Sequence, residues 1–221
     1  MNSIRYASIV SAAAIAAALV VWLMPRNVID EHRHIRQLVL HFTFERSDDP
    51  VIILGDSIVE ASTLPRAVCG HPVVNAGLNG ASTASDLGTW LGTALGGKPA
   101  AMIVVALGTN DALMAASPQE FTSRYGALLD QLAKLSPRLA VLGIPAVEAR
   151  LRMSEAMRDE AMKTIDGLNA VLPDIATRHE AAFASLPAMP APHTVDGVHL
   201  DANGYQVWDK AVMQAAARVC S

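Results

Sequence analysis

At 221 residues, the chain is long enough to form one α/β domain with a full hydrophobic core. Apolar residues make up 52% of the chain, which excludes a disordered protein. The formal net charge is −4, and no cluster of lysine and arginine stands out in the domain, so we expect no nucleic-acid partner.

The N-terminal run at residues 7–24 contains no charged residue. A membrane span takes about 20 apolar residues, whereas the apolar core of a cleaved signal peptide has about 7–15. We therefore expect residues 1–25 to form a transmembrane helix that acts as an uncleaved signal anchor. Two alternatives are cleavage after Ala18, which would release a secreted form, and a buried core helix.

The charges around this run support both orientations in the membrane. Only Arg5 and the α-amine precede it, whereas Arg26, Arg33 and Arg36 follow it. Counting positive charges favours a cytoplasmic domain. A short basic N-terminus before a single span is nevertheless the usual exporting arrangement, and two acidic residues lie among the arginines. We expect a membrane-anchored domain outside the cytoplasm, in the periplasm.

Residues 26–49 form a polar connector that we expect to be partly helical, and the domain follows at 50–221. The apolar stretch at 38–44 could anchor the connector on the domain or on the membrane surface. Asp48-Asp49-Pro50 then ends any regular structure before the first strand.

The domain alternates short apolar runs with longer segments of helical spacing. The runs predict five strands, at 51–54, 72–75, 101–107, 138–144 and 182–186. The helical segments are 58–68, 85–95, 118–135, 148–172 and 203–219. Ser117 and Asp201 are suitable N-caps for the third and the last of these helices.

This alternation predicts an α/β fold with three αβα layers and a roughly five-stranded parallel sheet of the flavodoxin-like kind, preceded by the transmembrane helix. In such sheets the active site lies at the carboxyl ends of the strands. Ser57, Gly77 and Asn110 each follow a predicted strand. We therefore expect these three residues to meet at one edge of the sheet.

Two short motifs supply the parts of a nucleophilic serine. Gly55-Asp56-Ser57 places a serine where a strand turns into a helix, and Asp196-Gly197-Val198-His199 places a histidine three residues after an aspartate. A serine hydroxyl needs a base to take its proton, and that base needs a third group to fix its tautomer. Ser57, His199 and Asp196 are candidates for these catalytic roles.

Four blocks in this order resemble the SGNH hydrolases, also called GDSL esterases and lipases. The blocks are Gly55-Asp56-Ser57-Ile58, Asn75-Ala76-Gly77, Gly108-Thr109-Asn110-Asp111 and Asp196-Gly197-Val198-His199. Ile58 departs from the leucine of the family name, which is an apolar exchange. The resemblance implies a serine esterase with an acyl-serine intermediate and no cofactor.

The resemblance also implies an oxyanion hole. Its expected donors are the backbone N–H of Ser57, the backbone N–H of Gly77 and the side-chain amide of Asn110. Gly77 suits this role because it has no Cβ to hinder the approach of substrate. We interpret Asp56 and Asp111 as structural, since acidic side chains at such turns bond nearby backbone N–H groups.

The chain has two cysteines, Cys69 and Cys220. In an oxidising compartment they could form a disulfide between the region after the first helix and the C-terminal helix. The alternative is two unrelated buried thiols. No Cys/His cluster suggests a metal site, and we expect none.

The sequence does not identify the substrate. The resemblance allows carbohydrate acetyl esters, short acyl esters, lysophospholipids and thioesters, and the predicted anchor favours an envelope or lipid substrate only weakly. Two other interpretations are an acyltransferase, in which a sugar hydroxyl resolves the acyl-enzyme, and a non-catalytic envelope-binding module. The sequence says nothing about the oligomeric state.

Overall fold

The computed structural model describes residues 30–151 and 153–220. The chain divides into two compact units, Met1–Val39 and Leu40–Ser221, and the second unit holds the sheet. The predicted transmembrane helix at 1–25 lies outside the described residues. Among the helices of the described part, none is long and apolar enough to cross a membrane.

Within the described residues, six strands form one sheet in the order β2-β3-β1-β4-β5-β6. Five of these strands run parallel, namely β3, β1, β4, β5 and β6, and β2 pairs antiparallel with β3 at the edge. The parallel strands have the order of a flavodoxin-like sheet. The strands are β1 Val51–Gly55, β2 Ala67–Val68, β3 His71–Gly77, β4 Met102–Ala106, β5 Leu139–Leu142 and β6 Ala182–Ala184.

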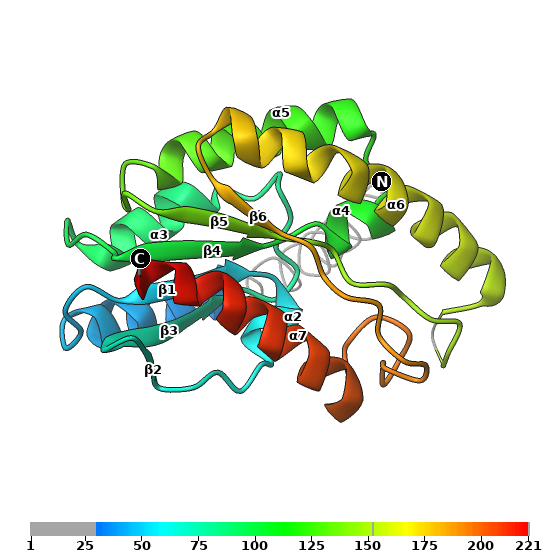
Figure 1. The fold of residues 1–221 in the computed structure, drawn as a ribbon, viewed down its shortest axis with the longest axis horizontal. Coiled ribbons are helices and arrows are strands. Elements are labelled where there is room, and N and C mark those ends of the chain that lie inside the picture. Colours follow the sequence, from blue (N-terminus) through cyan, green and yellow to red (C-terminus); the bar gives the residue numbers. More distant parts are fainter. Residues whose placement is uncertain (1–29, 152, 221) are drawn as a thin grey trace, which may run out of the picture. The chain divides into compact units, whose positions relative to one another are not determined.

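Helices cover both faces of the sheet, which confirms the three-layer α/β prediction (Figure 1). Ile52 and Leu54 of β1 belong to one buried apolar cluster with residues of α3, α5 and α6. Val51 and Ile53 belong to a second cluster with residues of α2 and α7. Successive side chains of β1 therefore enter opposite cores, and the strand is buried throughout, as expected for parallel sheets.

The helices have the following bounds: α2 Ser57–Glu60, α3 Leu87–Leu95, α4 Thr109–Leu113, α5 Pro118–Leu132, α6 Glu155–Arg178 and α7 Ala202–Ala216, which a short 3-10 helix extends at Ala217–Cys220. A further helix precedes β1, and its described part covers 30–44. Ser117 caps α5 in a capping box with Glu120, and Asp201 caps α7, as predicted.

The predicted helix at 58–68 is the largest error in the sequence interpretation. The helix ends at Glu60, and the chain goes on to β2, a sixth strand. β2 and β3 are joined by the two-residue turn Cys69-Gly70, whose φ angles are 49° and 84°. Positive φ at both residues is the geometry of a tight hairpin turn, so the local backbone preference works against a helix here.

The long helix α6 is also shifted from its predicted position at 148–172. It starts at Glu155 because Ser154 is its N-cap, and it continues through Pro173 to Arg178. Proline removes a helix hydrogen bond. The buried side chains of Leu172 and Ile175 on both sides of it keep this part of the helix against the core.

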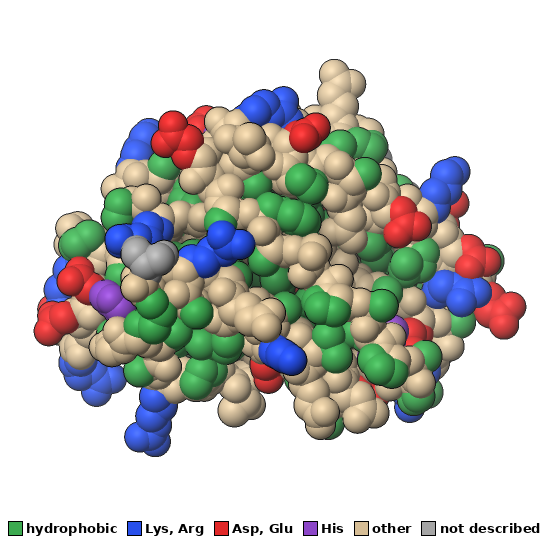
Figure 2. Space-filling model, in the orientation of Figure 1, with side chains coloured by type: hydrophobic (Ala, Val, Ile, Leu, Met, Phe, Trp, Pro, Cys, Tyr) green, Lys and Arg blue, Asp and Glu red, His purple; other side chains and the backbone are tan. Residues whose placement is uncertain are grey.

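A disulfide joins Cys69 and Cys220, with 5.7 Å between the two Cα atoms. It connects the turn between β2 and β3 to the 3-10 helix after α7. On the face shown in Figure 2, acidic and basic side chains are interspersed around the outline. Such mixing weakens the local electrostatic field on this face.

Candidate active site

Ser57 lies at the junction between β1 and α2. The strand ends at Gly55, and the side chain of Asp56 caps the helix by accepting a hydrogen bond from the N–H of Ile58 at 2.9 Å. A Cβ on Gly55 would lie 2.3 Å from the carbonyl oxygen of Ala106, so only glycine fits between β1 and β4. This close packing places the Ser57 hydroxyl at the carboxyl edge of the sheet.

Ser57, His199 and Asp196 form a continuous chain of hydrogen bonds. Oγ of Ser57 lies 3.0 Å from Nε2 of His199, and Nδ1 of His199 lies 2.9 Å from Oδ2 of Asp196. Oδ1 of Asp196 accepts the backbone N–H groups of Val198 at 3.1 Å and His199 at 2.9 Å. An ionised carboxylate only accepts, so Nδ1 carries the ring proton and Nε2 is left to accept the proton of Ser57.

The charge of Asp196 is favoured by these contacts. Partial burial acts to raise its pKa, but the hydrogen bonds from the His199 ring and from the backbone of His199 and Val198 outweigh it and lower the pKa to about 2. Asp196 is therefore ionised near neutral pH and can orient the imidazole.

Asn110 lies in the first turn of α4, directly after β4. Its Nδ2 donates a hydrogen bond to the carbonyl oxygen of Ala81 at 2.8 Å. The amide has two hydrogens on Nδ2, so this bond orients the group and leaves its second hydrogen for another acceptor. Gly55 and Ala106 pair in the register of β1 and β4, which brings the ends of the two strands, and hence Ser57 and Asn110, to the same edge.

Comparison with known proteins identifies the family of the chain. The model of the GDSL-like Lipase/Acylhydrolase family matches residues 53–207. The chain belongs to this family. Its members hydrolyse ester bonds, and the chain is accordingly an ester hydrolase of the SGNH type. No curated protein sequence matches the chain.

Several solved structures share the fold. A protein from Streptococcus pneumonia, provisionally described as a platelet activating factor, is 23% identical with a TM-score of 0.72, over 90% of this chain and 99% of that one. A carbohydrate acetylesterase from Sinorhizobium meliloti is 19% identical with a TM-score of 0.61, over 78% of this chain and 99% of that one. An acetylxylan esterase from Geobacillus stearothermophilus is 18% identical with a TM-score of 0.59, over 77% of this chain and 94% of that one.

In this GDSL-like hydrolase, Gly77 does not fit the predicted oxyanion role. Its backbone N–H donates to Oδ1 of Asn75 at 2.9 Å, so this donor is already engaged. A Cβ on Gly77 would lie 2.1 Å from the backbone nitrogen of Glu60, so the glycine is needed for the close approach of α2. Gly80, in the same loop, is exposed with a φ of 75°, and no atom lies within 4 Å of where its Cβ would be.

Two side chains that the sequence interpretation missed support α2, the helix that begins with Ser57. Nδ2 of Asn75 donates to the carbonyl oxygen of Val59 at 2.6 Å. The hydroxyl of Tyr205 on α7 donates to the carbonyl oxygen of Ile58 at 2.8 Å. The Val59 carbonyl also accepts the N–H of Ser62 at 3.0 Å, so Asn75 adds to the bonds that end the helix, whereas Tyr205 reaches the Ile58 carbonyl from another helix. No local signal marks Tyr205, since its role depends on the packing of α7.

The two acidic residues interpreted as structural are both buried. Asp111 accepts hydrogen bonds from the backbone N–H and the hydroxyl of Thr83. Burial raises the pKa of Asp56 to about 7, against the lowering effect of the Ile58 N–H. Neither carboxylate is part of the hydrogen-bond chain of Ser57. In the part of the chain that is described, no group of side chains could hold a metal ion.

Proposed function

We propose that Ser57 is the nucleophile in the hydrolysis of a short acyl ester, with His199 as general base and Asp196 as the group that orients it. The observation that carries this proposal is the unbroken hydrogen-bond chain of 3.0 Å and 2.9 Å from Ser57 through His199 to Asp196. Distances of this size allow direct proton transfer between the serine and the imidazole.

The reaction proceeds in two halves. The Ser57 oxygen attacks the ester carbonyl while its proton moves to Nε2 of His199, and a tetrahedral intermediate forms. The backbone N–H of Ser57 and the second amide hydrogen of Asn110 stabilise the oxyanion. The intermediate collapses, and the imidazolium protonates the leaving alcohol. Water then attacks the acyl-serine with the same base, which releases the acid and restores the hydroxyl.

We infer a small acyl group, such as acetyl, on a carbohydrate. This inference is supported by two structures of the same fold, the carbohydrate acetylesterase and the acetylxylan esterase, whose descriptions name such substrates. An acyl-serine pathway requires no metal or organic cofactor, because the triad and the oxyanion donors supply the chemistry.

The test uses the full chain with p-nitrophenyl esters of increasing acyl length. We expect acetate to be cleaved faster than octanoate. Ser57→Ala should keep the fold, as measured by circular dichroism, and should lose several orders of magnitude in kcat. If Ser57→Ala retained more than about a tenth of the wild-type kcat, Ser57 would not be the nucleophile. An added alcohol acceptor that suppressed release of free acid would identify an acyltransferase instead.

We further propose that the enzyme is held at a membrane with its domain outside the cytoplasm. The uncharged run at 7–24 supports an anchor, and the Cys69–Cys220 disulfide supports an oxidising compartment. The helix at 30–44 adds a stripe of exposed apolar side chains at helical spacing, which suits a membrane interface. The stripe consists of Ile35, Leu38, Val39 and Phe42.

The orientation is tested by a fusion of alkaline phosphatase after residue 221, since this reporter folds actively only where disulfides form. We expect high phosphatase activity in cells. An inactive fusion, together with an active cytoplasmic reporter at the same site, would place the domain inside the cell. A phosphatase-active protein recovered in the medium would indicate cleavage of the anchor.

A further inference from the structure

Asp196 and His199 lie in the irregular segment 193–200 between β6 and α7, which belongs to neither element. Their positions relative to Ser57 therefore depend on whatever holds this segment. We call it the triad loop. It lies against residues 146–150 and Met153, which follow β5 and precede α6.

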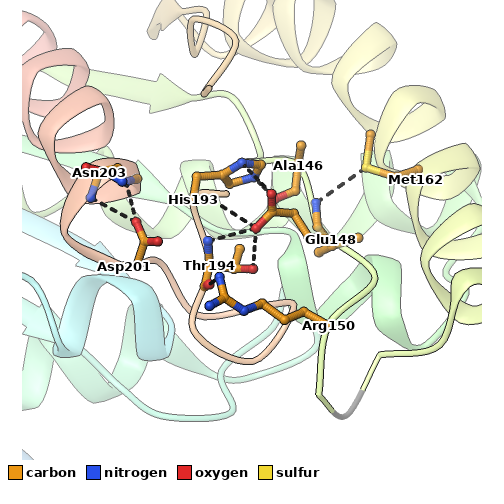
Figure 3. A network of polar contacts seen from close by, with 10 residues as sticks. Ala146, Glu148, Arg150, Met162, His193, Thr194, Asp201 and Asn203 are labelled. Atoms are coloured by element: carbon orange, nitrogen blue, oxygen red, sulfur yellow. Dashed lines mark hydrogen bonds and ion pairs between the residues drawn. The ribbon is translucent and has the colours of Figure 1, made fainter. Parts of the chain in front are cut away.

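One carboxylate makes most of the polar contacts between the two segments (Figure 3). Oε2 of Glu148 accepts the backbone N–H of His193 at 3.0 Å, the backbone N–H of Thr194 at 2.8 Å and the hydroxyl of Thr194 at 2.6 Å. Its Oε1 lies 3.2 Å from Nδ1 of His193. His193 and Thr194 are both buried, so these donors depend on Glu148 for satisfaction.

Backbone and side-chain contacts continue along the same pair of segments. Nη1 of Arg150 donates to the carbonyl oxygen of Thr194 at 2.6 Å. The backbone N–H of Glu148 donates to the carbonyl oxygen of Gly197 at 2.9 Å. A Cβ on Gly197 would lie 2.6 Å from the carbonyl oxygen of Glu148 and 2.5 Å from Cβ of Met153. At Gly197, the residue after Asp196, the triad loop therefore packs directly against Glu148, Arg150 and Met153.

The triad loop is also closed on itself. The N–H of Val195 donates to the carbonyl oxygen of His199 at 2.8 Å, and Thr194 forms an isolated bridge with Leu200. Oδ1 of Asp196 accepts the N–H of His199 inside this closed turn. A displacement of Thr194 is therefore transmitted to both Asp196 and His199.

We propose that Glu148 is a positioning residue for the reaction, which fixes the His199–Asp196 pair relative to Ser57 by holding the triad loop at His193 and Thr194. This inference rests on the proposed function. Glu148 does not touch the reacting atoms. Its effect is to keep Nε2 of His199 within hydrogen-bond distance of the serine oxygen. Burial acts to raise the pKa of Glu148, but the hydrogen bonds from Thr194 and His193 outweigh it and lower the pKa, so Glu148 is ionised near neutral pH and Oε2 accepts these bonds.

The first test is Glu148→Ala in the full-length protein. We expect kcat on p-nitrophenyl acetate to fall about 10- to 100-fold, since a shift of about 1 Å at a reacting group has an effect of this size. We expect KM to change by less than about threefold, because the residue does not contact substrate. Rates are corrected by titration with a serine-directed phosphonate, which counts competent sites. A kcat within about twofold of wild type would overturn the proposal.

Glu148→Gln separates geometry from charge. The amide oxygen can take the place of Oε2 and accept from Thr194, and its NH₂ can face Nδ1 of His193 if Nε2 of that ring donates to the carbonyl oxygen of Ala146, 3.2 Å away. We expect Glu148→Gln to recover most of the kcat lost in Glu148→Ala. If Glu148→Gln lost as much activity as Glu148→Ala, the negative charge rather than the position would be decisive, and the proposal would be wrong.

A matched control is Asp130→Ala. Asp130 also pairs with a histidine, His179, at 2.7 Å, but it lies near the carboxyl end of α5, at the amino edge of the sheet. Asp130 is exposed, so we expect its loss to change the melting temperature little and to leave kcat unchanged. If Asp130→Ala lowered kcat as much as Glu148→Ala does, the effect would be general destabilisation and the positioning role would be refuted.

A readout independent of turnover is the proton NMR signal of the hydrogen between His199 Nδ1 and Asp196. We expect this signal to broaden or disappear in Glu148→Ala and to persist in Asp130→Ala. An unchanged signal together with an unchanged rate of reaction of Ser57 with the phosphonate would refute the positioning role even if ester turnover fell. This readout also separates the two proposals, because retained activity in Ser57→Ala would refute the proposed nucleophile without affecting the NMR result.

Discussion

Replacing Asn110 with alanine removes two interactions that can be measured separately. One is the bond of 2.8 Å from Nδ2 to the carbonyl oxygen of Ala81, which contributes to stability. A hydrogen bond of this kind contributes about 1 kcal/mol, which corresponds to a fall of about 2–4 °C in melting temperature for a domain of this size. The other is the second amide hydrogen, which we assign to the oxyanion.

The loss of the oxyanion donor should appear in kcat. Removing one such donor lowers kcat about 10²–10³-fold, which corresponds to about 2.7–4 kcal/mol in the barrier. Because the ground-state carbonyl is bound less tightly than the oxyanion, KM should change much less than kcat. The assay is steady-state hydrolysis of p-nitrophenyl acetate at neutral pH, with active sites counted by phosphonate titration.

Asn169→Ala is the matched control. This asparagine also bonds the backbone through its side chain, to the N–H and the carbonyl oxygen of Ile144 at 2.8 Å and 3.1 Å. We expect Asn169→Ala to lose stability while keeping kcat within about threefold of wild type. If Asn110→Ala raised KM and left kcat unchanged, Asn110 would bind substrate and the oxyanion assignment would be wrong. An equal loss of kcat in both variants would also refute it.

Three further outcomes are expected. Gly77→Ala should destabilise the protein more than Gly80→Ala in urea unfolding. The Cβ of Gly77→Ala would lie 2.1 Å from a backbone nitrogen of α2, whereas the Cβ of Gly80→Ala would meet open space and only the strain of its φ of 75° would remain. Equal losses would contradict this account of Gly77. Cys69→Ser should lower the free energy of unfolding by up to about 5 kcal/mol, because the Cys69–Cys220 disulfide closes a loop across 151 positions of the sequence, and an unchanged unfolding midpoint would show that the bridge does not form in solution. Asp56 has a folded-state pKa raised to about 7 from 3.8, so its folded form binds more protons than the unfolded chain in this interval and stability should fall as the pH rises through it. The stability of Asp56→Asn relative to wild type should therefore increase as the pH rises from 4 to 7. If the free energies of unfolding of the two proteins changed in parallel with pH, the raised pKa of Asp56 would be refuted.

The sequence alone was sufficient to predict the parallel part of the sheet. The five parallel strands are short apolar runs followed by glycine or polar residues, and this local signal survives in the structure because parallel strands are buried on both faces. Their alternation with helical segments determines right-handed crossovers and brings the carboxyl ends to one edge. The edge strand β2 has only two residues and no such signal, and it falls within the last two residues of the predicted helix at 58–68, directly before the turn at Cys69-Gly70.

For the site, sequence reasoning identified the residues whose chemistry is visible in their type and order. Ser57 follows a buried strand, and the spacing of Asp196 and His199 fits a turn that closes on itself, which the structure contains. Asn110 was identified in the same way, as the polar residue after β4. Each of these identifications depends on a few neighbouring residues and on the position of one strand end.

Contacts between segments far apart in the sequence were decided only by the tertiary structure. The space at Gly77 is closed by the backbone of Glu60 on α2, which no property of the glycine itself indicates. Tyr205 reaches Ile58 across 147 positions of the sequence, and Glu148 reaches Thr194 across 46. A carboxylate becomes an anchor for a loop only when buried donors face it, and the arrangement of such donors is a property of the packed chain rather than of any local pattern.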